Sequence, residues 1–335
     1  MMLKELCLIN GTSGREEKVR EYIISKLPAD CEYRVDSLGN LICGKKGKNR
    51  AGSKVMLCAH MDEVGFIVTY ITDDGMLKIS PVGGIDERVV FGRSVVLENG
   101  KKGVIGGKAI HQTVGDEAEK LPKISDMYVD IGASSKKEAE TLANIGESVY
   151  FDSDYIEFGD GFIKSKAIDD RAGCKILIDL LSSRAEYDFT ACFFVQEEIG
   201  TRGSGPAAFS VAPDYAVVLE STTASDISGV EGNKKVCLLG GGAVVSYMDR
   251  GTVYDAELYR RTMSLAKEHG IKVQTKTVVA GGNDAAAIHK SGAGVKTVTV
   301  SVPTRYIHSP SSVAKAEDIE SVKKLASLLC GEFAK

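Results

Sequence analysis

Apolar positions near the start of the chain follow the spacing of an amphipathic helix. The stripe consists of Val19, Tyr22, Ile23 and Leu27. It stops at Pro28, which ends a helix, and Ser13 and Glu16 have the spacing of a capping box at its start. Short continuous apolar runs come next and predict buried strands. We expect these strands at 32–36, 40–45 and 54–59.

From Phe66 to about Ile110 the pattern changes to short β-type runs. Turn signals at 73–75 and 98–100 separate these runs, as in hairpins. Long helices and strands alternate again from about 163, after a short helical stretch. The expected helices lie near 135–143, 171–184, 254–269 and 316–333, and the expected strands near 189–195 and 214–219.

These two patterns of apolar and polar residues predict an α/β fold with an insertion. Residues 1–65 together with 163–335 are expected to form a catalytic α/β/α domain around a mixed sheet. Residues 66–162 are expected to form a small inserted domain that resembles a β-barrel. An insertion also explains how His60 and Asp169, which the chemistry below assigns to one site, come to be so far apart in the chain.

Composition narrows the class of protein. The net charge of the 335 residues is −4 without blocks of like charge, which favours neither nucleic acid nor a membrane surface as a partner. The charged N-terminus is unlike a signal peptide, and no run of about 18 apolar residues predicts a spanning helix. The eight cysteines include no CxxC pair, and several lie in apolar strands, which is typical of reduced thiols in a cytoplasmic protein.

Five residues of the metal-ligand type follow apolar runs or open a helix. They are His60, Asp169, Glu198, Glu220 and His308. Because the carboxyl ends of the strands in an open α/β sheet gather ligands, these side chains can converge in space. Each residue alone has an ordinary alternative, namely a histidine beside a solvated turn, a helix cap or a charge at a strand end. Together they predict a metal site, and one that holds two metals.

The spacing also suggests separate roles. Asp62 follows His60 by two residues and can hold the imidazole nitrogen that does not bind metal. Asp169 can bridge two cations through its two oxygens. Glu197 and Glu198 place like charges after a buried strand, which is costly without a partner. We expect Glu198 to bind metal and Glu197 to accept the proton of a metal-bound water, and a solvated loop pair is the alternative.

Charge and ligand type indicate which metals suit the site. The negative charges of three carboxylates and a hydroxide would balance the positive charges of two divalent ions. Mixed histidine and carboxylate ligands suit zinc best, and cobalt or manganese are the alternatives. Two such ions about 3.5–4 Å apart would hold a bridging hydroxide by lowering the pKa of water toward about 7. The glycine runs of the chain lack the patterns that bind nucleotides.

Six motifs, in this order, resemble those of the tetrahedral (TET) and glutamyl aminopeptidases, co-catalytic metallopeptidases often labelled cellulase or endoglucanase. The motifs are AHMDEVG at 59–65, GGIDERVVFG at 83–92, AIDDRAG at 167–173, QEEIGTRG at 196–203, GGNDAAAIH at 281–289 and IHSP at 307–310. The resemblance covers essentially the whole chain. It implies that the five residues above are the metal ligands with Asp169 bridging, that Glu197 is the general base, and that Asp62 supports His60.

The resemblance carries two further implications and two departures. It implies that 66–162 is a dimerisation domain and that the chain forms homo-oligomers, from a dimer to a tetrahedral dodecamer. Glu220 stands where the family commonly has Asp, which bears on the geometry of one metal position. Asn283 stands where Thr is frequent, which bears on the substrate pocket.

The predicted function is removal of N-terminal residues from short peptides by a metal-bridging hydroxide, with Glu197 as general base. A glucan-cleaving glycosidase is disfavoured because adjacent Glu197 and Glu198 cannot easily flank a sugar, and the chain has no Trp. A non-catalytic peptide-binding homologue is an alternative, and so is the same centre cutting a different bond, as in a deacetylase or carboxypeptidase. The preferred N-terminal residue stays open, with Arg250 and Arg305 as candidates for an acid-binding pocket.

Overall fold

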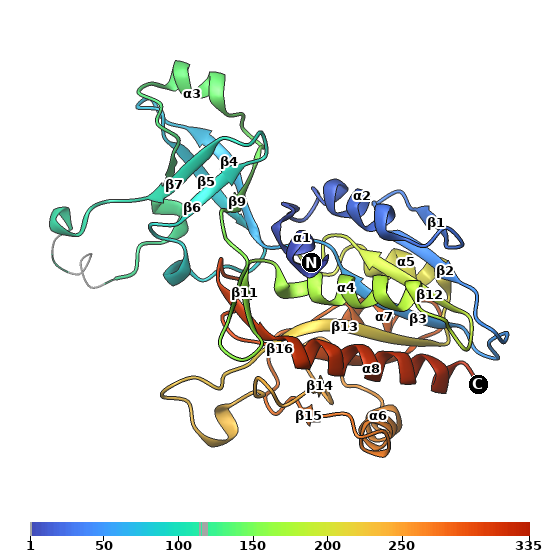
Figure 1. Ribbon diagram of the computed structural model, residues 1–335. Coiled ribbons are helices and arrows are strands. Elements are labelled where there is room, and N and C mark those ends of the chain that lie inside the picture. Colours follow the sequence, from blue (N-terminus) through green and yellow to red (C-terminus); the bar gives the residue numbers. More distant parts are fainter. Residues whose placement is uncertain (1, 114, 116–119) are drawn as a thin grey trace.

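An eight-stranded mixed sheet forms the centre of the computed structural model, which describes residues 2–113, 115 and 120–335 (Figure 1). In sheet order its strands are β1 (Glu32–Val35), β2 (Leu41–Lys45), β12 (Phe189–Phe194), β3 (Val55–His60), β13 (Tyr215–Thr223), β16 (Lys296–Thr304), β14 (Ala243–Val245) and β15 (Val273–Thr275). The four central strands β12, β3, β13 and β16 run parallel to one another. Antiparallel pairing of β2 with β12 and of β14 with β16 makes the sheet mixed.

Both faces of the sheet are covered by helices. Alternate side chains of a strand point to opposite faces, and the central strands are apolar throughout, so each strand contributes to two cores. In β3, Leu57 and Ala59 belong to one core, and Met56 and Cys58 belong to the other. The first core includes residues of α1 (Met2–Leu8), α2 (Glu17–Lys26), α4 (Ile168–Ser182), α6 (Ala256–Glu268) and α8 (Ala316–Phe333). The second includes residues of α5 (Ser204–Val211) and α7 (Ala285–Ile288), so the α/β/α prediction is confirmed.

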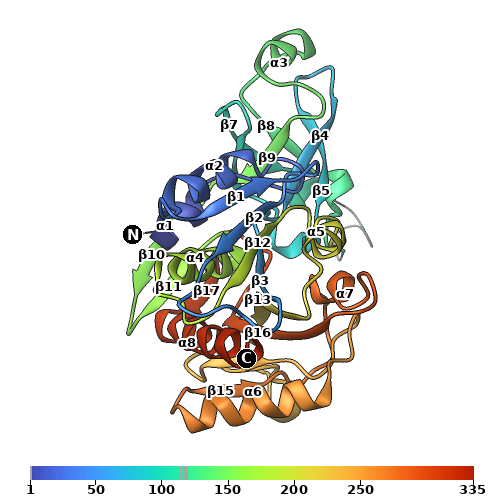
Figure 2. The same ribbon diagram turned by 90° about the vertical axis from the view of Figure 1, so that its right-hand side faces the viewer.

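A closed barrel is inserted in the chain between β3 and α4, and it projects from the α/β/α layers (Figure 1). Its strands are, in barrel order, β4 (Gly65–Ile71), β5 (Leu77–Val82), β8 (Tyr128–Asp130), β7 (Lys102–Gly106), β6 (Ser94–Leu97) and β9 (Ser148–Phe151). Phe66 and Phe151 meet edge to face in its core, with ring centroids 5.3 Å apart. Helix α3 (Lys136–Leu142) lies at its far end (Figure 2). The prediction of a barrel-like fold in the insertion is therefore confirmed.

The structure adds a small sheet between these two parts of the chain. Strand β11 (Phe162–Ser165) pairs with β10 (Ile156–Phe158) on one side and with β17 (Ser312–Lys315) on the other. It lies outside the barrel, so the exact boundary of 66–162 stays a prediction.

The predicted capping box at Ser13 and Glu16 is wrong. Ser13 Oγ donates to Asp62 Oδ2 at 2.6 Å instead of capping α2. Glu16 Oε1 accepts the backbone N–H groups of Gly14 and Gln196, at 2.8 and 3.0 Å. Both side chains face the ends of the central strands. There Ser13 donates to the buried carboxylate of Asp62, and Glu16 gives the N–H of Gln196 an acceptor, which the solvated start of α2 needs less.

Two further features bear on the sequence predictions. The eight cysteines are buried free thiols. Within the part of the chain that the structure describes, no helix combines the length and apolar character that crossing a membrane requires.

Candidate metal centre

The strand register brings two of the predicted ligands to the same level. His60 is the last residue of β3 and pairs with Phe194 of β12. On the other side Cys58 pairs with Val218 of β13, so two residues further along these parallel strands His60 lies beside Glu220. Glu197 and Glu198 follow Phe194 within a few residues, and they therefore approach His60 from the opposite neighbour.

All five predicted ligands converge. His60 Nε2 lies 3.3 Å from Asp169 Oδ1 and 3.5 Å from Glu220 Oε1. His308 Nε2 lies 3.3 Å from Asp169 Oδ2 and 3.2 Å from Glu198 Oε2. The two oxygens of Asp169 thus face two different histidine–glutamate pairs. This arrangement forms two half-sites that share one carboxylate.

These separations can be tested against the size of a metal ion. Ligand atoms about 2.0–2.1 Å from a tetrahedral zinc ion lie about 3.3–3.4 Å from one another, by the geometry of a tetrahedron. The four separations between 3.2 and 3.5 Å match this spacing. Imidazole and carboxylate are also the donor types that zinc, cobalt and manganese accept. The residues therefore fit a pair of divalent cations.

Both histidines are oriented by a hydrogen bond on the other ring nitrogen. His60 Nδ1 lies 3.0 Å from the backbone O of Asp62 and 3.4 Å from Asp62 Oδ1, so the contact foreseen for Asp62 is shared between its backbone and its carboxylate. His308 Nδ1 lies 2.8 Å from Gly84 O. Each Nδ1–H donates to a carbonyl, so Nε2 is the ring nitrogen that faces the carboxylates, and on losing its proton it would offer its lone pair to a metal ion.

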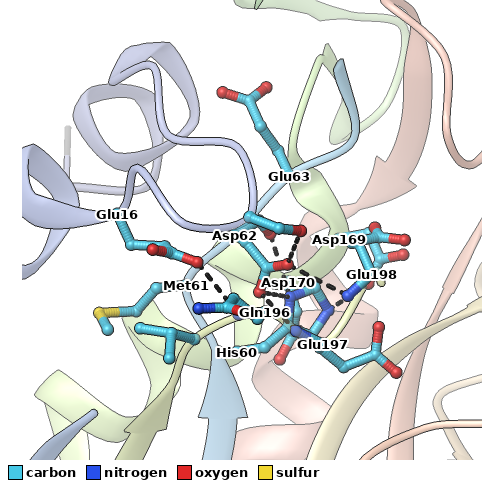
Figure 3. Close-up of polar contacts among 12 residues, drawn as sticks. Glu16, His60, Met61, Asp62, Glu63, Asp169, Asp170, Gln196, Glu197 and Glu198 are labelled. Atoms are coloured by element: carbon cyan, nitrogen blue, oxygen red, sulfur yellow. Dashed lines mark hydrogen bonds and ion pairs between the residues drawn. The ribbon is translucent and has the colours of Figure 1, made fainter. Parts of the chain in front are cut away.

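Two buried carboxylates accept hydrogen bonds from the turn that carries Glu197 and Glu198 (Figure 3). Asp62 accepts the backbone N–H of Glu197 at 3.0 Å and that of Glu198 at 3.1 Å. Glu16 accepts the N–H of Gln196, whose φ of 58° places it in the left-handed region. Three successive amides are thus fixed, and the side chains of Glu197 and Glu198 leave the turn in different directions (Figure 3).

Sequence reasoning missed the part that the barrel plays in this site. Gly83 and Gly84 follow β5 in the barrel, and Gly84 supplies the carbonyl that orients His308. Gly83 has φ 88°, and a Cβ there would lie 2.8 Å from Val64 Cγ1 and 3.2 Å from Glu198 Cβ. Only glycine fits such a contact. The signal was the motif at 83–92, which the sequence alone did not connect with the site.

Two further acids lie beside the predicted ligands, and sequence reasoning assigned neither of them to the site. Asp170 Oδ1 accepts the N–H of Gly173 at 3.0 Å, as a helix cap does, and Asp170 also lies close enough to His60 and Glu220 to share a cation with them. Asp284 is buried, which raises the pKa of its carboxyl to about 7. Arg171, the next residue after Asp170, donates to backbone carbonyls, among them Met61 O at 2.7 Å, and so ties α4 to the chain next to the ligands.

Burial and mutual repulsion make this cluster take up protons. Burial raises the pKa of Glu197 well above its ordinary value, and Glu220 adds to the effect against the opposing influence of His60. Burial followed by the charge of Asp169 raises the pKa of Glu220 to about 8. Burial alone would lower the pKa of His308, but Asp169 and Glu198 raise it to about 11. Metal ions bind the deprotonated ligands, so cations would replace these protons.

A cavity of about 410 Å³ opens beside the ligands. Asp169, Glu197, Glu198, Glu220 and His308 all line it. Its size is that of a pocket for a small ligand. Asn283 also lines the cavity, but its side-chain amide is engaged with Asp249 and Tyr254, so its polar atoms serve the wall and not a substrate.

A three-layer α/β fold with this cluster at its strand ends is the architecture of a metal-dependent hydrolase. The family model of the M42 glutamyl aminopeptidases matches residues 39–325, and the chain belongs to this family. It is therefore a peptide hydrolase of the aminopeptidase class, and membership implies divalent metal ions.

Relatives and solved structures agree with this assignment. The chain is 31% identical to a lysyl aminopeptidase of Pyrococcus furiosus, over 99% of this chain and 96% of the relative. It is also 31% identical to a glutamyl aminopeptidase of Lactococcus lactis, over 94% and 91%. The structure of the TET1 peptidase of Pyrococcus horikoshii, which can assemble into a tetrahedron or a large octahedral shell, matches with a TM-score of 0.85 at 34% identity, covering 98% of each chain. The predicted resemblance to TET and glutamyl aminopeptidases is confirmed.

Proposed function

We propose that this aminopeptidase uses two divalent ions to remove N-terminal residues from short peptides. Zinc is the preferred ion, and cobalt or manganese are the alternatives. His60 and Glu220 would hold one ion, His308 and Glu198 would hold the other, and Asp169 would bind both. The observation that carries the proposal is the position of Asp169, whose two oxygens lie 3.3 Å from two different histidines.

The residues around the ions divide the chemistry. When bound, the ions would polarise the scissile carbonyl and lower the pKa of water toward about 7. Glu198 is engaged with His308, whereas Glu197 lines the cavity and its carboxylate has no hydrogen-bond or ion-pair partner among the described residues. Glu197 is thus free to take a proton from the attacking water and to pass it to the leaving amine. Asp62 holds His60 and the turn in place.

Replacing Glu197 tests this assignment. In Glu197→Gln we expect kcat to fall by about 10²–10⁴-fold, the usual contribution of a general base, while the chain still binds metal. Glu231→Gln, at an exposed glutamate, is the matched control. The assay is hydrolysis of chromogenic aminoacyl anilides by metal-reconstituted protein. Peptide cleavage by Glu197→Gln at the wild-type rate would remove Glu197 from the mechanism.

Blocked peptides separate this function from its rivals. An aminopeptidase needs the free α-amine of its substrate, so N-acetylated peptides should resist cleavage. A deacetylase would release acetate from the same peptides, and a carboxypeptidase would shorten them from the other end. Mass spectrometry of the products distinguishes the three outcomes.

The assembly is part of the proposal. We expect residues 66–162 to act as the dimerisation domain and the chain to assemble up to a tetrahedral dodecamer, as the Pyrococcus horikoshii relative forms a tetrahedron. Support comes from that likeness and from the barrel, which stands away from the α/β layers (Figure 1). Light scattering coupled to gel filtration measures the mass, and a monomer at all concentrations would contradict the proposed assembly.

The buried thiols support a cytoplasmic location.

A further inference from the structure

A buried ion pair lies between the segment that enters the barrel and the segment that returns to the α/β layers. Glu63 comes two residues before β4, and Lys166 directly follows β11. Each of the two side chains is only 3% exposed. Lys166 Nζ donates to Glu63 Oε1 at 2.7 Å and to Glu63 Oε2 at 3.0 Å, and it also donates to Asn10 Oδ1 at 2.6 Å. The three N–H donors of the ammonium group are therefore engaged inside the protein, which offsets the cost of burying its charge.

Glu63 is also held from a second direction. Its Oε1 accepts the backbone N–H of Gly11 at 3.1 Å, and its own backbone N–H donates to Gly11 O at 2.9 Å. The guanidinium of Arg171 lies 3.9 Å from the same Oε1. Figure 3 shows the carboxylate of Glu63 pointing away from the turn of Glu197 and Glu198. The ion pair therefore fixes the chain beside the metal centre and does not act as a ligand.

The positions of the two residues in the chain link the pair to two of the predicted ligands. Glu63 follows His60 by three residues, and Lys166 precedes Asp169 by three. Three residues span at most about 10–11 Å, so neither ligand can move far while the ion pair holds both segments. His60 Nε2 and Asp169 Oδ1, which these two segments carry, lie 3.3 Å apart. The ion pair and the ligand pair thus join the same two segments.

A small cavity lies between the ion pair and the ligands. Its volume is about 10 Å³, roughly the space of one water molecule. Its lining includes Glu63, Lys166, Asp169, Glu198 and His308. The ion pair and three ligands border one narrow space, so a displaced ion pair would leave room for Asp169 to shift. The two residues of the pair are not among the described residues that line the larger cavity of about 410 Å³.

Stability alone does not explain a buried ion pair at this place. Desolvation offsets much of the attraction between buried charges, and apolar residues of similar volume often replace such a pair without loss of stability. What directed hydrogen bonds between two charges supply is a fixed separation of the segments that carry them. A metal site depends on such a separation, because its ligand distances must hold to within about 0.2 Å.

We propose that Glu63 and Lys166 are positioning residues of the metal centre, which hold His60 and Asp169 at the separation where one cation binds both. The inference rests on the proposed two-metal function, because that function assigns His60 and Asp169 to one ion. Without the ion pair the set of ligands is complete but its geometry is loose. The pair therefore acts on the affinity and the coordination of the ion, and not on the binding of the peptide.

The most direct test removes both charges at once. Lys166→Met or Glu63→Gln alone would leave a buried charge without its partner, whereas the double variant Glu63→Gln/Lys166→Met removes the ion pair as a whole. We expect its zinc affinity, measured by competition with a chromogenic chelator, to fall by about 10- to 100-fold, the usual effect of lost support around a metal ligand. The visible absorption of the cobalt-loaded protein reports coordination geometry and should change. At saturating zinc, kcat for an aminoacyl anilide should fall while KM stays near its wild-type value.

A second buried lysine provides the matched control. Lys45 is 9% exposed and pairs with Asp30 at 3.5 Å, but it lines a different cavity. Lys45→Met should leave the zinc affinity and the cobalt spectrum unchanged. Lys166→Arg keeps the charge and presents a wider, planar group to Glu63. It should change the cobalt spectrum even if urea unfolding of the metal-free protein shows that the double variant does not fold.

The outcomes separate this inference from the proposed function. Wild-type zinc affinity and an unchanged cobalt spectrum in the folded double variant would overturn the positioning role, and so would an unchanged spectrum in Lys166→Arg. Equal losses in Lys45→Met would also overturn it, because any buried lysine would then have the same effect. The proposed function fails on a different observation, namely a wild-type protein that binds no zinc or that cleaves no aminoacyl anilide when zinc is bound.

Discussion

Asp62 is the residue whose replacement tests the construction of the site most directly. Its carboxylate is fully buried and accepts four contacts, from Ser13 Oγ at 2.6 Å, Glu197 N at 3.0 Å, Glu198 N at 3.1 Å and His60 Nδ1 at 3.4 Å. Burial alone would raise the pKa of Asp62, but His60 and these donors hold it below its ordinary value. Asp62 is therefore an ionised acceptor at neutral pH.

Asp62→Asn keeps the shape and removes the charge and one acceptor. In the best orientation the new amide nitrogen faces His60 and the N–H of Glu197, which leaves a buried backbone donor without a partner. A lost hydrogen bond to a charged group costs about 1.5–3 kcal/mol, or about 10- to 150-fold in any equilibrium that needs the turn in place. Loss of support around a metal ligand lowers metal affinity or activity by about 10- to 100-fold, which is the same range.

The assay is zinc affinity, measured by competition with a chromogenic chelator, together with kcat/KM at saturating metal. We expect zinc affinity to fall by about 10- to 100-fold in Asp62→Asn. Ser13→Ala is the control, because it removes one donor and leaves each backbone N–H its acceptor. Wild-type zinc affinity and activity in Asp62→Asn would show that the turn does not depend on the carboxylate.

Three other outcomes are expected. Gly83→Ala should weaken metal binding more than Gly92→Ala, because both glycines have positive φ (88° and 75°) but only the Cβ at Gly83 meets Val64 and Glu198, and equal effects in a metal titration would refute this. Arg171→Leu should lower the free energy of unfolding in urea by several kcal/mol, since each buried carbonyl without a donor costs about 1–3 kcal/mol, and a loss as small as that of a surface arginine would contradict it. The metal-free protein should lose stability as pH rises from about 4.5 to about 8, because Glu220 with its raised pKa holds a proton in the folded state that the unfolded chain releases. The measurement is urea unfolding in the presence of a chelator at several pH values. A free energy of unfolding that rises over this pH range would refute the prediction.

The fold could be predicted from the sequence where burial sets the pattern. Apolar runs in β3, β12 and β13 are buried on both faces, so their composition alone indicates central strands. The short helix α5 is absent from the predicted helices, because Gly205 near its start is a poor helix former and burial of the helix against the sheet compensates for this. The capping box failed for a related reason, since the strand ends recruit Ser13 and Glu16 through contacts distant in sequence.

The candidate ligands could be singled out from the sequence, but the groups that support them could not. Residue type and position at strand ends single out His60, Glu198 and Glu220, because the chemistry of a ligand is local. Gly84 carries no side chain and acts through its carbonyl, so residue type says nothing about its contact with His308.

The contact between Gly84 and His308 also bears on how the barrel relates to catalysis. If the inserted barrel served assembly alone, its strands could be removed without touching the half-site of His308 and Glu198. Gly84 O lies 2.8 Å from His308 Nδ1, and Gly83 packs against Glu198, so the loop after β5 is a wall of the site. Any movement of the barrel relative to the sheet would reorient the imidazole that faces Asp169. The position of the barrel therefore bears on the geometry of this half-site, whatever part the barrel plays in assembly.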